Sequence, residues 1–256
     1  MTPEIVYTPE SAMAIFAHPD DIEFTCAGTL AIWARRGARI SYVLCTSGDV
    51  GLNTPGMTKE KAAAIRETEQ RKAAEITGAK EAIFLKEPDG MLQSSLALRK
   101  KIVREIRRFR PEVIITGDPT VFFPKGSRIN HPDHRAAATA ALDAAFPAAG
   151  QPNLFEELEQ EGVTAFKPRK VFVVNPQTAD TFIDISETID VKIQALRAHS
   201  SQFENWDPAE RIRQRAAAIG EKAGMKFAEA FRVITLESDD NWHKLNRFLA
   251  SRQTQR

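Results

Sequence analysis

Two short segments of the chain combine histidine and aspartate in a pattern that suits metal-ion catalysis. They are Ala17-His18-Pro19-Asp20-Asp21 and Asn130-His131-Pro132-Asp133-His134-Arg135. The chain holds five histidines, and three of them fall in these two segments. Two imidazoles and one carboxylate form a three-ligand set that leaves a fourth position for water, which distinguishes catalytic from structural zinc. The residue types therefore predict a metal-activated water.

A general base is also available in the first segment. Water bound to zinc ionises near pH 7, and a nearby carboxylate can take its proton. Asp20 is adjacent to Asp21, which is the ligand-type carboxylate, and cannot easily share its coordination direction. We therefore expect Asp20 to be the base. A single His-Pro-Asp is more often a turn than a metal site, but two such motifs favour the metal site.

Both segments follow predicted β-strands. The first comes directly after the apolar run Met13–Phe16, and the second follows the run Val113–Thr116 and an irregular loop. Ligands of open α/β sheets bind at the carboxyl ends of the strands. Pro132 suits the first turn of a helix, and the i, i+3 spacing then places His131 and His134 on one helix face.

Short apolar runs alternate with longer stretches of helical period, which is typical of βαβ units. The predicted strands are Met13–Phe16, Ile40–Cys45, Ile83–Leu85, Val113–Thr116 and Val171–Val174. The predicted helices between them are Gly28–Arg36, Thr58–Thr77, Leu96–Phe109 and Pro132–Phe146. The pattern predicts an α/β fold of the Rossmann-like kind, with a mostly parallel sheet flanked by helices.

The second half of the chain is less regular. We expect a loop over Gly150–Pro168 with one helical turn, followed by two helices and a late strand. These three elements are Ser186–Ala198, Pro208–Ala223 and Glu229–Leu236. At 256 residues a single domain over 1–256 is expected, with a core of about 11–236 and a C-terminal tail over 237–256 whose last residues fray.

The composition excludes several classes of partner. The formal net charge is +1, so neither nucleic acid nor an anionic membrane is indicated. No apolar run approaches the roughly 18 residues of a membrane-spanning helix. Met1–Pro9 lacks the features of a secretory signal, and a cytoplasmic location is expected. Cys26 and Cys45 each lie in an apolar segment and are expected to be buried, inert thiols.

At the residues described above the sequence resembles the PIG-L/LmbE-like family of zinc-dependent de-N-acetylases. The first family motif is Ala17–Asp21, continued by Gly28-Thr29-Leu30, and the second is His131–His134. Further similar segments occur in the same order and extend the resemblance over most of residues 11–236. They are Thr46-Ser47-Gly48-Asp49, Arg66-Glu67, Pro88-Asp89-Gly90 and Ala230-Phe231-Arg232.

The resemblance implies a role for each residue of the two motifs. His18, Asp21 and His134 would bind one Zn²⁺, with other divalent cations as alternatives, and Asp20 would be the general base. His131 would assist the leaving amine or steady the oxyanion, and Asp133 would orient and charge an imidazole.

The family also implies a substrate and the residues that contact it. The substrate would be a small amino sugar of the N-acetylglucosamine type or its conjugate. Arg66 and Asp89 would hold the sugar hydroxyls, although a solvated helix residue and a Pro-Asp-Gly turn are the alternatives.

Three weaker features keep two interpretations each. Phe122-Phe123-Pro124 could stack on a sugar, but core packing is favoured. His199-Ser200-Ser201-Gln202 lies where related chains carry a similar motif, and a capping or interface role is the alternative. Gly48–Met57 is either a lid over the metal or a plain surface loop.

Other functions remain open at this point. An iron(II) oxygenase also uses two histidines and one carboxylate, but such sites usually lie in β-barrels. A nucleotide-binding module lacks its glycine-rich motif here. A catalytically silent sugar-binding relative would not need Asp20. Apolar helices beyond Ser186 leave a homo-oligomer open.

Overall fold

The fold is built on one seven-stranded sheet in the order β3-β2-β1-β4-β5-β7-β6. The computed structural model describes residues 7–124, 128–203 and 206–251. Strands β3, β2, β1, β4 and β5 are parallel, and β7 is antiparallel to both β5 and β6. The strands are β1 Ser11–Phe16, β2 Arg39–Thr46, β3 Glu81–Glu87, β4 Val113–Gly117, β5 Lys170–Val174, β6 Thr181–Asp184 and β7 Ala228–Thr235. The expected α/β class, with a mostly parallel sheet in a single domain, is confirmed.

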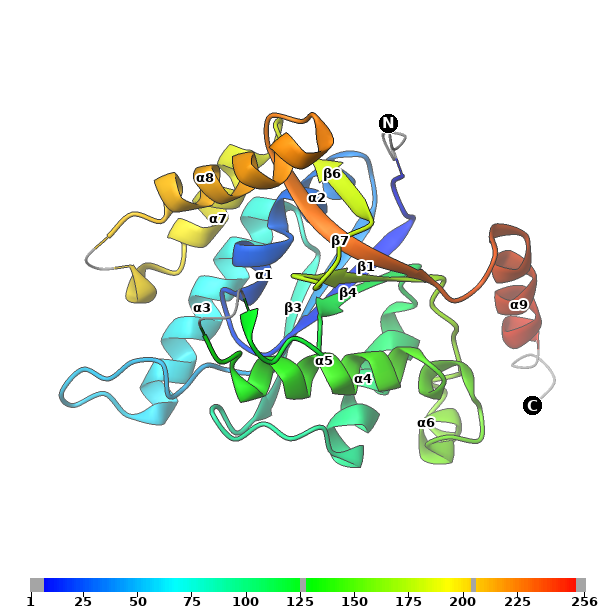
Figure 1. Cartoon of the computed structure of the whole chain (residues 1–256). Helices are drawn as coiled ribbons and strands as arrows, with labels where there is room; N and C mark the ends of the chain where they lie inside the picture. The colour runs from blue at the N-terminus through cyan, green and yellow to red at the C-terminus, as the bar shows by residue number, and fades with distance from the viewer. Residues whose placement is uncertain (1–6, 125–127, 204–205, 252–256) are drawn as a thin grey trace.

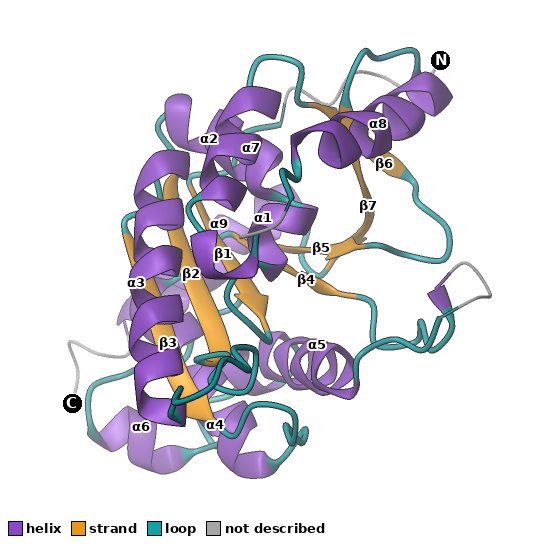
Figure 2. Cartoon of the chain, turned by 90° about the vertical axis from the view of Figure 1, so that its left-hand side faces the viewer, coloured by secondary structure: helices purple, strands orange, loops and turns teal. Residues whose placement is uncertain are grey.

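Helices cover both faces of the sheet (Figures 1 and 2). Helices α1, α2, α3, α7 and α8 lie on one face, and α4 and α5 lie on the other. The helices are α1 Asp21–Thr25, α2 Ala27–Arg35, α3 Lys59–Thr77, α4 Leu96–Phe109, α5 Pro132–Ala145, α6 Glu156–Gln160, α7 Ile189–Arg197, α8 Ala209–Gly220 and α9 Asp239–Ser251. Within the described ranges, no helix is long and apolar enough to cross a membrane.

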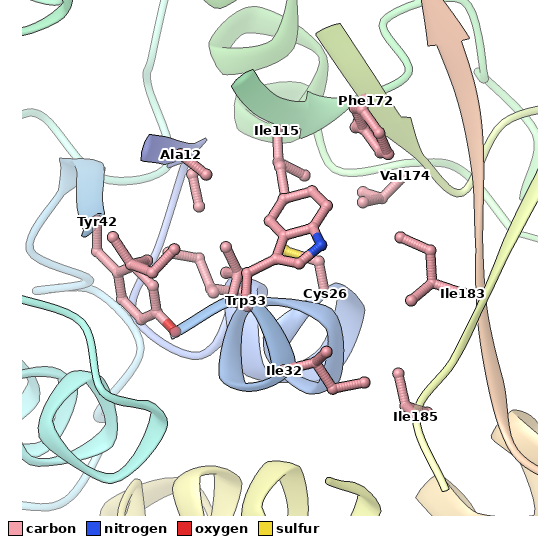
Figure 3. Close-up of a cluster of buried hydrophobic side chains, with 14 of the residues drawn as sticks. Ala12, Cys26, Ile32, Trp33, Tyr42, Ile115, Phe172, Val174, Ile183 and Ile185 are labelled. Atoms are coloured by element: carbon pink, nitrogen blue, oxygen red, sulfur yellow. The ribbon is translucent and has the colours of Figure 1, made fainter. Parts of the chain in front are cut away.

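The strands of the parallel part are apolar on both sides because each face packs against helices. In β1, alternate residues enter different cores: Ala12 and Ala14 face one cluster, whereas Met13 and Ile15 face the other. Figure 3 shows Trp33 of α2 in the first cluster. Its ring packs edge-on against Phe172, with centroids 5.4 Å apart.

The five strands and four helices expected in the first two thirds of the chain are confirmed. Helix α3 begins after Thr58, whose hydroxyl accepts a hydrogen bond from the Lys61 amide at 3.3 Å, and it ends at Gly78 with φ of 82°. Three elements were not expected: α1, β6 and α9. Helix α1 and strand β6 have only five and four residues, too few for a clear hydrophobic period, whereas α9 is amphipathic and its period was overlooked.

The segment 237–256, expected as a tail, contains helix α9. Trp242 buries its indole against Phe166, with ring centroids 6.2 Å apart, and its Nε1 donates to the Lys167 carbonyl at 2.7 Å. Asp239 at the start of the helix also pairs with Arg169, so an aromatic contact and an ion pair together hold it. The fraying expected at the last residues concerns 252–256, which lie outside the described residues.

The two cysteines lie on opposite sides of the sheet. Cys26 belongs to the cluster under α2 and α7, and Cys45 belongs to the cluster under α4 and α5. Both are buried and free, as expected. Burial raises the pKa of both thiols well above the ordinary range.

We predict that Trp33→Ala lowers the free energy of unfolding by about 3–5 kcal/mol, because it leaves a large cavity in the first core. Trp33 is only 1% exposed. Phe123→Ala is the control, since Phe123 is 63% exposed and its loss should change stability by no more than about 0.5 kcal/mol. Chemical denaturation measures both. Equal effects of the two substitutions would contradict the packing described here.

Candidate metal and active site

The two histidine-aspartate segments meet at the carboxyl ends of β1 and β4. These strands are parallel neighbours, so the chain that follows each emerges at the same edge of the sheet. The imidazole of His18 lies 4.8 Å from that of His131 and 5.2 Å from that of His134, between ring centroids. Segments that are distant in the sequence therefore form one site.

Asp21 joins the imidazoles of the two segments. Its Oδ1 lies 3.1 Å from Nε2 of His134, and its Oδ2 lies 3.5 Å from Nδ1 of His18. Ligand atoms about 2.0–2.2 Å from a tetrahedral zinc ion are about 3.3 Å from one another. Each of the two spacings is close to this value, although Asp21 meets the two imidazoles through different oxygens.

The Asp21 carboxylate is held in its charged form. Burial alone would raise its pKa, but the charge and hydrogen bonds of His134 and His18 outweigh burial and keep the pKa well below its usual range. In return, the charge of Asp21 raises the pKa of His134 against the effect of burial. The His18 amide also donates to Oδ2 of Asp21 at 2.9 Å.

A second group of carboxylates faces the other side of the His18 ring. Nε2 of His18 lies 3.1 Å from Oδ1 of Asp89 and 3.2 Å from Oδ2 of Asp133. Backbone amides hold Asp133, which accepts from Gly90 at 2.7 Å and from Leu92 at 3.1 Å. Burial lowers the pKa of His18, but its carboxylate partners outweigh burial and raise it to about 12. Such surroundings attract a cation.

With one ligand atom taken from each residue, His18, Asp21 and His134 are not among the groups of three that lie within 4.8 Å of one another. Among the described residues, two groups bring three candidate ligand atoms within 4.8 Å of one another: His18, His131 and His134, and His18, Asp89 and Asp133. Asp133 is fully buried, and both of its carboxylate oxygens accept hydrogen bonds from backbone amides. These contacts suit a residue that orients His18 better than they suit a metal ligand.

Asp20 occupies an unusual backbone conformation beside these groups. Its φ of 90° lies in the left-handed region, which residues other than glycine rarely adopt. Its Oδ2 lies 3.2 Å from Nη2 of Arg66. Burial raises the pKa of Asp20 to about 7, with Asp21 and Glu23 acting in the same direction and with Arg66 and His199 opposing it.

His131 lies at the N-terminus of α5 with its ring half exposed. Its Nδ1 accepts a hydrogen bond from the Asp133 amide at 3.2 Å, so Nε2 carries the proton in the neutral ring. Burial and the charges of His18 and His134 lower the pKa of His131. The imidazole nearest to the Asp133 carboxylate is that of His18, because the His131 ring is 4.0 Å away.

The two residues expected to contact sugar lie beside the site but are buried. Arg66, on α3, donates to the carbonyls of Pro19 at 2.7 Å and Gly48 at 3.1 Å. Asp89 accepts from the Val50 amide at 2.8 Å through the oxygen that does not face His18. The interpretation of Arg66 as a solvated residue is wrong, and contacts of both residues with sugar hydroxyls stay a prediction.

The structure corrects one expectation for the loops and refines another. Phe122 and Phe123, favoured as core residues, are 47% and 63% exposed. The guanidinium of Arg135 lies 3.9 Å from the centroid of the Phe122 ring, which holds that ring on the surface. The loop that begins at Gly48 is fixed at its start by the contacts of Arg66 and Asp89 described above.

Sequence reasoning missed one residue of the site altogether. Gln70, on α3, accepts a hydrogen bond from the Asp20 amide at 3.0 Å and is fully buried. It lies one helical turn after Arg66, and this spacing of polar residues on a buried helix face was the signal that could have found it.

Comparison with known proteins decides the family. The family profile PIG-L, described as GlcNAc-PI de-N-acetylase, matches residues 13–145, which is more than half of the chain. This chain belongs to the PIG-L family. The matched region holds both histidine-aspartate segments, and the resemblance inferred from the sequence is confirmed.

Two similar proteins, aligned over most of this chain, are deacetylases by name. Diacetylchitobiose deacetylase of Thermococcus kodakarensis is 30% identical over 88% of this chain and 83% of its own. A probable N-acetyl-α-D-glucosaminyl L-malate deacetylase of Bacillus anthracis is 29% identical over 75% of this chain and 80% of its own.

A solved structure supports the same assignment. N,N'-diacetylchitobiose deacetylase from Pyrococcus horikoshii, bound to its inhibitor MPG, superposes with a TM-score of 0.80 at 27% identity. The match covers 89% of this chain and 84% of that one. The expectation of an N-deacetylase, a hydrolase of amide bonds, is confirmed over the nucleotide-binding and oxygenase alternatives.

We predict that Asp133→Asn weakens zinc binding by about 10- to 100-fold, because the amide loses the charge that orients His18 and cannot accept both backbone hydrogen bonds as before. Competition with a chromophoric chelator measures the affinity. Asp143→Asn is the matched control on the same helix, since Asp143 pairs with Arg99 away from the site. Unchanged affinity in Asp133→Asn would contradict the orienting role.

Proposed function

We propose that the protein is a zinc-dependent de-N-acetylase of an N-acetylglucosamine-type amino sugar or its conjugate. The observation that carries the proposal is the position of Asp21 between His18 and His134, with Asp20 next to it in the chain. Family membership supports the reaction class.

Three side chains would hold the ion. His18, Asp21 and His134 offer two nitrogens and one carboxylate, with each imidazole within 3.5 Å of Asp21, and the half-exposed ring of His134 leaves the solvent side open. When bound, zinc would supply a water of lowered pKa and polarise the amide carbonyl. Other divalent cations accept the same donors, so the identity of the ion is part of the proposal.

Asp20 is assigned as the general base. It lies beside Asp21, but its carboxylate contacts Arg66 on α3 and not the imidazoles of His18 and His134. We assign it to take the proton of the attacking water. Arg66 contacts only one of the two carboxylate oxygens, namely Oδ2.

His131 is assigned to the leaving group and the oxyanion. Because its Nδ1 accepts from the Asp133 amide, the Nε2–H is the donor that faces outward from the helix. In this neutral form the Nε2–H donor can stabilise the negative oxygen of the tetrahedral intermediate. To protonate the departing amine, the ring would first have to take up the proton that the attacking water gives to Asp20. Asp133 acts with it by orienting the neighbouring His18 ring.

The substrate class follows from the relatives and from the rim of the site. The named relatives act on diacetylchitobiose and on an N-acetylglucosaminyl malate. Exposed apolar side chains adjoin residues of the site: Val50 donates its own amide to Asp89, Met91 lies between the two amides that bind Asp133, and Phe122 packs on Arg135. These surfaces suit the apolar faces of a sugar, and Arg66 and Asp89 remain the proposed contacts for its hydroxyls.

The direct experiment is an acetate-release screen over N-acetylglucosamine derivatives, including diacetylchitobiose and the malate and inositol conjugates. In this screen we predict that Asp20→Asn retains zinc but loses about 10²- to 10⁴-fold in kcat, since it removes a general base and no ligand. Metal analysis of the purified protein accompanies the assay. Full activity of Asp20→Asn would show that another group is the base.

We predict that His134→Ala loses both zinc and activity, because two ligands do not retain the ion as three do. A chelator should abolish activity of the unaltered protein, and added zinc should restore it. His243→Ala is the matched control, since His243 is exposed on α9. Acetate release that resists the chelator, or zinc retained at full occupancy in His134→Ala, would contradict the proposed ligand set.

A further inference from the structure

A line of buried polar side chains connects His199 to the backbone of Asp20. Nε2 of His199 lies 3.3 Å from Oε2 of Glu23. The other oxygen of Glu23 accepts from the side-chain amide of Gln70 at 2.9 Å, and the carbonyl oxygen of Gln70 accepts from the Asp20 amide at 3.0 Å. His199, Glu23 and Gln70 are each fully buried. They come from three separate parts of the fold.

Burial of these groups needs an explanation, because removing polar groups from water is unfavourable unless they are paired. Their position gives one. Within the described residues, none of the three makes a hydrogen bond or ion pair with His18, Asp21 or His134. This chain of contacts therefore reaches Asp20, the residue assigned as the base, and does not contact the three residues assigned to the metal.

The geometry of Asp20 shows what the line holds. A non-glycine residue with φ of 90° persists only where its surroundings fix it. Helix α3 holds both polar groups of the peptide that precedes this residue: Arg66 donates to the Pro19 carbonyl at 2.7 Å, and Gln70 accepts from the Asp20 amide. The direction of the Asp20 carboxylate depends on this backbone conformation.

We propose that Gln70, supported by Glu23 and His199, is a positioning residue that holds Asp20 in the left-handed conformation in which it serves as the base. The inference rests on the role assigned to Asp20 in the proposed function. Glu23 attracts the NH₂ group of Gln70 and so leaves the carbonyl oxygen for Asp20; the opposite amide orientation would bring two N–H groups together.

The same helix also secures the segment that carries His199. Glu69, next to Gln70, accepts from the Ser200 hydroxyl at 3.0 Å and from the Ser201 amide and hydroxyl at 2.7 Å each. The His199-Ser200-Ser201-Gln202 motif thus contributes to the site without reaching it. Its histidine supports Glu23, and its serines attach it to α3.

The test compares Gln70→Leu with Thr77→Val on the same helix. We expect Gln70→Leu to lower kcat by about 10- to 100-fold, with KM and zinc content within twofold of the unaltered protein, because a misplaced base affects turnover alone. Thr77→Val also loses a buried hydrogen bond, to Tyr42 at 2.7 Å, but should leave kcat unchanged. The substrate is the N-acetylglucosamine derivative cleaved fastest in the screen. An unchanged kcat in Gln70→Leu would overturn the inference.

A double variant separates this inference from the proposed function. In the Asp20→Asn background, Gln70→Leu should cause no further loss of kcat, since the base that it positions is already absent. A full additional loss would show that Gln70 acts elsewhere and would overturn the inference while the role of Asp20 stands. Full activity of Asp20→Asn alone would instead overturn the proposed base.

Substitutions at His199 provide a rescue experiment. The His199 ring faces Glu23 at 3.3 Å without the geometry of a hydrogen bond. His199→Gln keeps a polar group facing Glu23 and should retain most of kcat, whereas His199→Phe leaves Glu23 facing an apolar ring and should reproduce the loss seen in Gln70→Leu. Thermal unfolding of each variant verifies folding. If Gln70→Leu does not fold, Gln70→Asn, one methylene shorter, carries the same expectation. Equal kcat in the two His199 variants would contradict the proposed line.

Discussion

The carboxylate of Asp21 between two imidazoles is the interaction on which the site depends. One imidazole follows β1 and the other lies on α5, so the contact exists only because β1 and β4 are parallel neighbours in the sheet. The sheet fixes where the two segments emerge, and the helices on both faces keep the strands in register. The apolar core of this PIG-L protein therefore determines the geometry of its most polar residues.

A second layer of contacts holds the first. His18 is oriented by Asp133, and Asp133 is in turn held by the Gly90 and Leu92 amides. Asp20 is flanked by Arg66 and Gln70, two residues one turn apart on α3. Each side chain proposed for chemistry thus has partners on an element other than its own. These partners restrict the directions of the side chains, and catalytic groups must be held in this way to act on a bound substrate.

The sequence allowed more to be predicted about position than about contacts. Apolar runs indicated the parallel strands, and the two motifs after them indicated where histidine and aspartate side chains would gather, because both signals are local. The buried line from His199 to Gln70 depends on which helix faces pack together. The spacing of Gln70 from Arg66 indicates a shared helix face but does not say what packs against that face. The direction of Asp20 depends on a backbone angle that its residue type does not favour.

The charge balance of the site links its stability to its function. Four carboxylates converge on a small region: Asp20, Asp21, Asp89 and Asp133. Among the described residues, the permanently charged cation that pairs with one of them is Arg66, at Asp20. Without a further positive charge, carboxylates that are this close raise one another's pKa or draw protons onto the imidazoles, as the raised pKa of His18 shows. A bound divalent cation would remove this repulsion and favour neutral imidazoles. The same crowding that makes the metal-free site unfavourable therefore favours metal binding. Metal binding would thus offset the cost of keeping four carboxylates close together in the folded chain.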